Sequence, residues 1–118
     1  ILFADLNNKL INKEIIQKLK KHNTKEKFFF SSIKPNFNKY EEKRYWRGPV
    51  WINCNWIIYQ GLKNKDVIFA KKVRKKTIDL IEENGFYEYY NSETGKAYGA
   101  NNFSWTASLF LDLIFEKK

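Results

Sequence analysis

Aromatic, arginine and glutamate side chains gather in three short segments of this sequence. Residues 45–51 are Tyr-Trp-Arg-Gly-Pro-Val-Trp, residues 85–90 are Gly-Phe-Tyr-Glu-Tyr-Tyr, and residues 102–107 are Asn-Phe-Ser-Trp-Thr-Ala. Aromatic rings stack on the apolar faces of sugar rings, and Arg and Asn side chains hydrogen-bond hydroxyl groups. A glutamate among aromatic residues is a candidate general acid or base. These residue types together predict one half of a sugar-cleaving site.

Several of these residues also have a structural interpretation that the sequence leaves open. Glu88 can be a surface glutamate beside a turn, and Arg47 can belong to a buried ion pair. Trp51 can be an ordinary core residue, because buried tryptophans are common in protein interiors. From the residue types alone, a structural role is favoured for Glu88, and both roles stay open for Arg47 and Trp51.

The first part of the chain is predicted to hold short helices and a long loop. Residues 1–6 are expected to end one helix, and Asn12 is expected to cap a second helix that ends near His22. Residues 23–44 lack a helical repeat and are predicted to form a loop. Loops of this length in compact domains are often functional.

Three helices are predicted in the rest of the chain. Pro49 suits the first turn of a helix over about 50–62, which is apolar nearly all round. An amphipathic helix follows, capped by Asn64 and ending before Gly85. The last helix, over about 104–115, is again apolar on most sides. This alternation indicates two concentric layers, with apolar inner helices and an amphipathic outer helix.

A hairpin or irregular excursion is predicted over about 86–98, between the outer helix and the last inner helix. Gly95 is expected to supply a positive φ at its turn. Glu88 lies on this excursion, whereas the carboxylates of Asp79, Glu82 and Glu83 are predicted to be solvated on the outer helix.

Composition argues against several other classes of protein. The chain has 118 residues, of which 43% are hydrophobic and 18% aromatic, so it fits one domain with a core. No apolar run is long enough for a transmembrane helix, and no membrane partner is predicted. The single Cys54 and single His22 offer no metal-ligand pattern.

The net charge of +9 raises the alternative of a basic nucleic-acid-binding helical domain. The basic residues are 19 Lys and only 3 Arg, and the lysines are spread along the chain. Recognition of bases and bidentate contact with phosphates favour Arg. The charge therefore indicates a compositional bias, and nucleic acid is not predicted as a partner.

In this order, the three segments resemble the C-terminal motifs of clan-G glycoside hydrolases. The match is best with the mannosylglycerate hydrolase-like branch, near the processing α-glucosidases and more distantly the trehalases, and it covers nearly the whole chain. The resemblance implies an all-α fold, with residues 1–118 forming the C-terminal portion of an (α/α)6 barrel. It implies inverting hydrolysis of an α-mannoside or α-glucoside, such as mannosylglycerate, glucosylglycerate or an oligosaccharide, without a cofactor.

The resemblance also assigns roles to individual side chains. Glu88 occupies the glutamate of the family's Gly-Phe-x-Glu-Tyr motif, which implies that it is the general base. Asn102 stands where many relatives have an acidic or amide side chain. The side chains implied to bind the carbohydrate substrate are Tyr45, Trp46, Arg47, Trp51 and Asn102.

The family's general acid, an aspartate, has no match in this chain. Asp5 and Asp112 lie in helical stretches without its motif. The chain is therefore expected to be a piece of a longer polypeptide, to need the N-terminal remainder as its partner, and to be inactive alone. An inactive sugar-binding module of the same fold is the alternative within this class.

Overall fold

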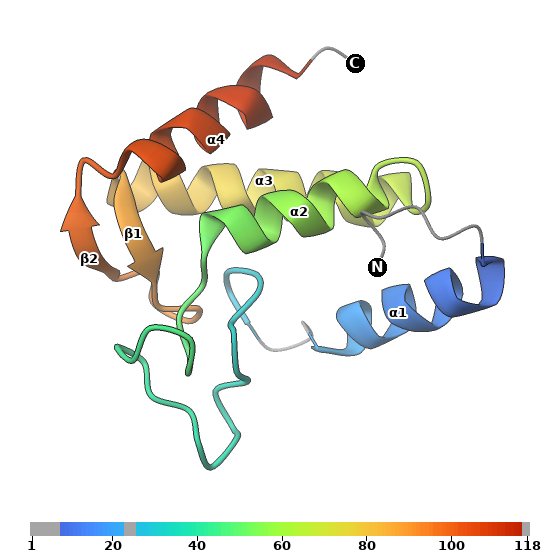
Figure 1. The fold of residues 1–118 in the computed structure, drawn as a ribbon, viewed down its shortest axis with the longest axis horizontal. Coiled ribbons are helices and arrows are strands. Elements are labelled where there is room, and N and C mark those ends of the chain that lie inside the picture. The colour runs from blue at the N-terminus through green and yellow to red at the C-terminus, as the bar shows by residue number, and fades with distance from the viewer. Residues whose placement is uncertain (1–7, 23–25, 117–118) are drawn as a thin grey trace.

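The chain folds into helices around one small hairpin, as Figure 1 shows. The structure, a computed structural model, describes residues 8–22 and 26–116, so the helix expected over 1–6 lies outside the described residues. The predicted all-α class with one hairpin excursion is confirmed. The elements in chain order are α1 (Lys9–His22), α2 (Ile52–Leu62), α3 (Val67–Asn84), β1 (Tyr87–Tyr90), β2 (Ala97–Asn101) and α4 (Ser104–Phe115).

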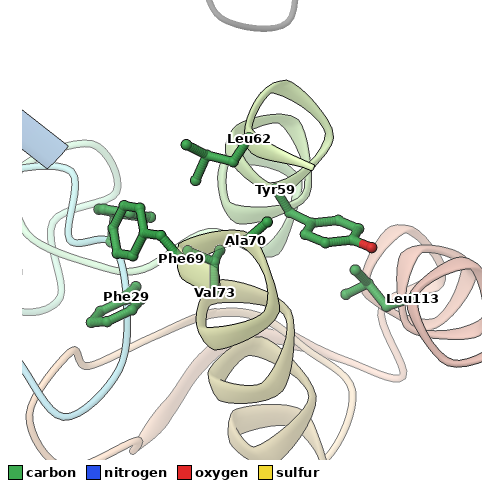
Figure 2. Packing of buried hydrophobic residues seen from close by; sticks show 8 residues of the cluster. Phe29, Tyr59, Leu62, Phe69, Ala70, Val73 and Leu113 are labelled. Carbon is green, nitrogen blue, oxygen red and sulfur yellow. The ribbon is translucent and has the colours of Figure 1, made fainter. Parts of the chain in front are cut away.

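α3 packs against α2 and α4, and the hairpin lies at one end of these three helices (Figure 1). The larger core cluster is formed around Val73 of α3. Phe29 from the long loop packs on one side of it and Leu113 from α4 on the other (Figure 2). The side chains of α3 that are buried form one stripe, Phe69, Ala70, Val73, Thr77, Leu80 and Ile81, as its amphipathic pattern predicts.

α2 and α4 have more apolar surface than this core covers. Ile57 of α2 is 44% exposed, and Leu111 and Phe115 of α4 are 52% and 74% exposed. Large exposed apolar surfaces are normally covered by another part of the same or a partner protein. This arrangement fits the predicted inner helices of a larger helical barrel. Among the described residues, none of the helices is both long and apolar enough to span a bilayer.

The predicted caps of α1 and α3 are wrong by a few residues. α1 begins at Lys9, because the Asn8 side chain accepts hydrogen bonds from the first-turn amides, so Asn12 lies inside the helix. Asp66 rather than Asn64 caps α3, and its carboxylate also pairs with Lys20 of α1 at 2.5 Å. Asp66 is the better cap because one carboxylate satisfies a helix-terminal amide and binds a lysine.

The predicted start of α2 is also wrong, because Pro49 does not lie in its first turn. Val50 exchanges backbone hydrogen bonds of 2.7 and 3.0 Å with Tyr90 of β1. Trp51 keeps extended backbone angles, so α2 begins only at Ile52. This bridge fastens the end of the long loop directly to the hairpin.

The hairpin extends to Asn101, beyond the predicted limit of 98. Gly95 has φ +78 at its turn, as predicted. The strands pair antiparallel, with Tyr87 opposite Asn101 and Tyr89 opposite Tyr98. β2 therefore has one extra residue between these pairs, and the resulting bulge lies opposite Glu88. Bulges of this kind change the direction of a side chain next to many active sites.

Candidate active site

Both carboxylate oxygens of Glu88 accept hydrogen bonds from neighbouring elements. Oε1 accepts from the Tyr45 hydroxyl at 3.0 Å, and Oε2 accepts from the backbone N–H of Ala100 at 3.2 Å. Ala100 can donate because the β2 bulge frees its amide from the strand ladder. Gly99 lies against the carboxylate, and a Cβ on Gly99 would lie 2.5 Å from Oε2. The bulge therefore leaves room for the Glu88 carboxylate, and this space is free only because residue 99 is glycine.

Tyr45 joins the long loop to this carboxylate. Its backbone has φ +30, and its carbonyl accepts a hydrogen bond of 2.9 Å from the Trp51 indole. The hydrogen bond to Glu88 is the main cause that raises the pKa of the Tyr45 phenol above its usual value. The phenol therefore stays protonated at neutral pH and serves Glu88 as a donor.

Four aromatic rings form a row beside this pair, which we call the aromatic column: Trp46, Trp51, Tyr89 and Tyr98. Trp46 stacks on Trp51 at 4.4 Å between ring centroids, and Trp51 stacks on Tyr89 at 5.2 Å. Tyr89 lies 6.1 Å from Tyr98. Trp51 is only 3% exposed, whereas Trp46 is 50% exposed at the end of the column. The column therefore presents one accessible indole, supported from behind by a buried one.

Trp46 and Glu88 are linked through one side chain, that of Tyr45. The Tyr45 ring lies edge-on to Trp46, with 5.8 Å between centroids, while its hydroxyl binds Glu88. The same tyrosine thus touches the accessible indole and the carboxylate. The two candidate groups therefore both contact Tyr45.

Arg47 pairs with a carboxylate of its own loop. Its Nη1 lies 3.0 Å from Glu41 Oε1, and Arg44 binds the same oxygen at 3.1 Å. The Arg47 side chain is 42% exposed, so the ion pair that the sequence left open is present but is not buried. The next position, Gly48, requires glycine, because a Cβ there would lie only 2.6 Å from the backbone carbonyl oxygen of Glu41.

Asn102 lies apart from these groups in its contacts. It directly follows β2, is exposed, and has φ +54. Its backbone N–H donates to the Asn101 side chain at 2.7 Å. Within the described part of the chain, no hydrogen bond or ring contact joins Asn102 to Tyr45 or Glu88.

The remaining carboxylates of the described helices have structural partners or face solvent. Asp112 accepts a hydrogen bond from the Trp56 indole, and Asp79 binds Lys75 at 2.7 Å on the surface of α3. Glu82 and Glu83 are exposed, as predicted, while Asp5 lies outside the described residues. The described part of the chain holds no group of three or more His, Cys, Asp or Glu side chains that could bind a metal ion.

A separate groove of about 550 Å³ lies between α1 and the turn that joins α2 to α3. Its lining includes Lys20, Asn64 and Asp66. In Figure 1 this turn is at the opposite end of α2 and α3 from the hairpin that carries Glu88. This groove and the candidate chemistry are therefore in different places.

Sequence reasoning missed Glu42, Tyr89 and Tyr98. Glu42 accepts hydrogen bonds of 3.1 Å from the Tyr98 hydroxyl and from the side-chain amide of Asn91. The tyrosines on both predicted strands of the hairpin could have marked Tyr89 and Tyr98 as a cross-strand pair on one face of it. Glu42 had no such signal, because acidic loop residues are normally solvated.

The sequence model of the mannosylglycerate hydrolase MGH1-like glycoside hydrolase domain matches residues 1–106. The chain belongs to this family. A mannosylglycerate hydrolase of Rubrobacter radiotolerans is 45% identical over 76 residues, covering 62% of this chain and 17% of the relative. Another from Thermus thermophilus is 36% identical over 98 residues, covering 82% of this chain and 24% of the relative. The chain thus spans about a quarter or less of these family members.

A solved family member has the same fold over this region. The crystal structure of a GH63 mannosylglycerate hydrolase from Thermus thermophilus, in complex with glucose, superimposes with a TM-score of 0.84 at 34% identity. The superposition covers 93% of this chain and 29% of that protein. The described helices and hairpin therefore correspond to one portion of a larger glycoside hydrolase domain, as the resemblance implies.

Proposed function

We propose that the full-length protein containing this chain is an inverting glycoside hydrolase and that Glu88 is its general base. The observation that carries the proposal is a carboxylate held by Tyr45 and the β2 bulge beside an accessible indole. Family membership supports the reaction class. The substrate class is an α-mannoside or α-glucoside of a small acid such as glycerate, since the relatives are mannosylglycerate hydrolases.

In this mechanism the ionised Glu88 carboxylate accepts a proton from a water molecule. The water oxygen forms a bond to the anomeric carbon while the glycosidic bond breaks, and the leaving oxygen takes a proton from the general acid. That acid lies on the part of the protein outside this chain. The two carboxyl groups of an inverting enzyme stand roughly 6.5–9.5 Å apart, which leaves room for the water.

The neighbouring side chains suit the sugar-binding part of this task. The half-exposed Trp46 offers an apolar face for a sugar ring, and the buried Trp51 holds that indole in place. Arg47 is half-exposed and can exchange Glu41 for a sugar hydroxyl or a substrate carboxylate. Asn102 is exposed directly after β2, so in this proposal it contacts only a substrate that extends past the hairpin.

The test is the anomeric configuration of the first sugar released by the full-length protein. Proton NMR during hydrolysis of α-mannosylglycerate and α-glucosylglycerate should show the β-anomer appearing first, before mutarotation, because a single displacement inverts the anomeric centre. Initial release of the α-anomer would contradict the inverting mechanism. No release from these glycosides would contradict the proposed substrate class.

A sugar-binding module without catalysis is the second candidate. It is favoured by the fact that protein donors already occupy both oxygens of Glu88. Such a module would bind mannosylglycerate in calorimetric titration and leave it intact in the NMR experiment. Since each carboxylate oxygen has two lone pairs, one donor on each oxygen still leaves room for water.

A further inference from the structure

Glu42 is bound to the hairpin by two side chains that come from different parts of it. Oε1 accepts from the Tyr98 hydroxyl on β2, and Oε2 accepts from the Asn91 amide at the turn, both at 3.1 Å. Asn91 is 4% exposed, and its side-chain oxygen Oδ1 accepts hydrogen bonds from the backbone N–H groups of Glu93 and Thr94. The carboxylate therefore joins the long loop to a buried residue that is itself hydrogen-bonded to the hairpin turn.

Glu42 lies in a segment, residues 41–47, whose two ends are hydrogen-bonded to each other. The backbone N–H of Glu41 donates to the Arg47 carbonyl at 2.7 Å, and Arg44 and Arg47 both bind the Glu41 carboxylate. We call residues 41–47 the closed loop. Contacts between its two ends hold this loop together, and Tyr45 and Trp46 are part of it.

Two routes connect Glu42 to the accessible indole. One is the closed loop itself, which leads through the backbone to Trp46. The other is the aromatic column, which begins with Tyr98 at Glu42 and ends with Trp46. These routes form a ring of contacts, in which Glu42 accepts the two hydrogen bonds from Tyr98 and Asn91, and the Tyr89 hydroxyl adds a longer one to the Lys43 carbonyl at 3.4 Å.

We propose that Glu42 is a positioning residue, which holds the closed loop against the hairpin so that Trp46 and Tyr45 stay in register with Glu88. This inference rests on the proposed function, because it assigns Trp46 to sugar binding. Glu42 acts through Tyr98 and Asn91 and does not itself touch the reacting atoms. Its loss should move the sugar-binding side chains more than it moves Glu88, which the hairpin amide of Ala100 also holds.

The expected effect is therefore on substrate affinity. In the full-length protein, Glu42→Ala should raise KM for mannosylglycerate about tenfold, the scale of one hydrogen bond to a charged group, while kcat stays within about threefold. Glu42→Gln keeps one acceptor oxygen and should fall between wild type and Glu42→Ala. Tyr98→Phe should raise KM by less than Glu42→Ala does. The double variant should be no worse than Glu42→Ala, because both changes remove the same contact.

Glu93→Gln is the matched control, because this glutamate is exposed on the hairpin turn and loses the same charge. KM should be unchanged in this variant. Equal KM values for Glu42→Ala and wild type would overturn the inference, as would parallel losses of thermal stability and kcat with an unchanged KM. If Glu42→Ala does not fold, Tyr98→Phe decides the question in the same way.

Binding in the absence of turnover separates this inference from the proposed function. Mannosylglycerate titrated by calorimetry into the Glu88→Gln protein should bind about tenfold more weakly when Glu42→Ala is added. If the wild-type protein cleaves no glycoside, the proposed function fails. A glucose titration followed by tryptophan fluorescence then still tests Glu42, and equal affinities with and without Glu42 would reject the positioning role.

Discussion

The hairpin and the closed loop hold adjacent halves of the candidate site by different means. Glu88 lies on β1, which is fixed by backbone pairing with β2 and with Val50. Trp46 lies on the closed loop, which contacts the hairpin through the side chains of Glu42 and Tyr45, while the backbone bridge at Val50 comes later in the chain. We infer that the position of the carboxylate is set by backbone geometry, whereas the position of the indole is set by side-chain contacts. Changes in the hairpin should therefore act on turnover, and changes in the closed loop on affinity.

The largest expected effect comes from the carboxylate itself. Glu88→Gln in the full-length protein should lower kcat at least about 10²-fold, the low end for a lost general base. The amide is nearly isosteric, so the melting temperature should change little. Steady-state kinetics on mannosylglycerate measure this, and a variant that retains more than about a tenth of wild-type kcat would remove Glu88 from the role of base.

The next largest effect is expected at Gly99, which lies against the Glu88 carboxylate. Gly99→Ala should lower kcat by about tenfold or more, because small displacements of a catalytic group are costly. Its Cβ would collide with Glu88 and with the Tyr89 ring, at 2.5 and 2.8 Å. Kinetics should show a fall in kcat with a smaller change in KM.

Gly85→Ala is the control for the backbone cost. Gly85 also has a positive φ, +85, but a Cβ there meets only the Tyr87 ring at 3.7 Å. By chemical denaturation, Gly85→Ala should lose about 1–3 kcal/mol of stability because of its backbone conformation, and Gly99→Ala should lose at least as much because its Cβ also collides with its neighbours. Only Gly99→Ala should lose turnover. Equal kinetic effects in the two variants would mean that the hairpin does not position Glu88 as inferred.

Changes in the closed loop should affect KM more than kcat, the reverse of changes in the hairpin. Trp46→Ala should raise KM about tenfold, since an aromatic stacking contact contributes about 0.5–1.5 kcal/mol, and should change kcat less. Phe37→Ala is the control, because Phe37 is a similarly exposed aromatic residue, 54%, of the same long loop. A fall in kcat without a change in KM would show that the loop does not act on affinity separately from the effect of the hairpin on turnover.

The smallest effect is expected far from both regions, at the cap of α3. Lys20 and the Phe69 amide lower the pKa of Asp66, so Asp66 stabilises the fold above the usual carboxyl pKa and this contribution is lost as the pH falls through the lowered value. Asp66→Ala should cost about 1 kcal/mol near pH 7, and less in acid. Kinetic constants should be unchanged.

Thermal melts between pH 7 and pH 3 measure this difference. Asp79→Ala is the control, because Asp79 pairs with Lys75 within one exposed helix face, where ion pairs contribute little. A constant difference between wild type and Asp66→Ala across this range would contradict the proposed source of the stabilisation.

The sequence predicted the parts of this structure that depend on local pattern. The helical periods, the hairpin around Gly95 and the aromatic segments follow from neighbouring residues, so these elements were predictable. The cap of α3 was not, because Lys20 from another helix helps to favour Asp66 over Asn64. Glu42 was not either, because its partners lie 49 and 56 residues later in the chain. Loop glutamates reveal their role only when the fold brings such partners to them.

The left-handed backbone of Tyr45 limits which amino acids this position can accept. At φ +30 a side chain carries a conformational cost of about 1–2 kcal/mol, which glycine avoids and asparagine tolerates best. Glycine would remove the hydroxyl that reaches Glu88, and asparagine is too short to replace a phenol across the same gap. The Trp51 indole, bound to the Tyr45 carbonyl, keeps the unfavourable torsion in place. Few amino acids at position 45 can therefore keep both the backbone conformation and the hydrogen bond to Glu88. In a library that varies each position of the loop, position 45 should tolerate the fewest substitutions.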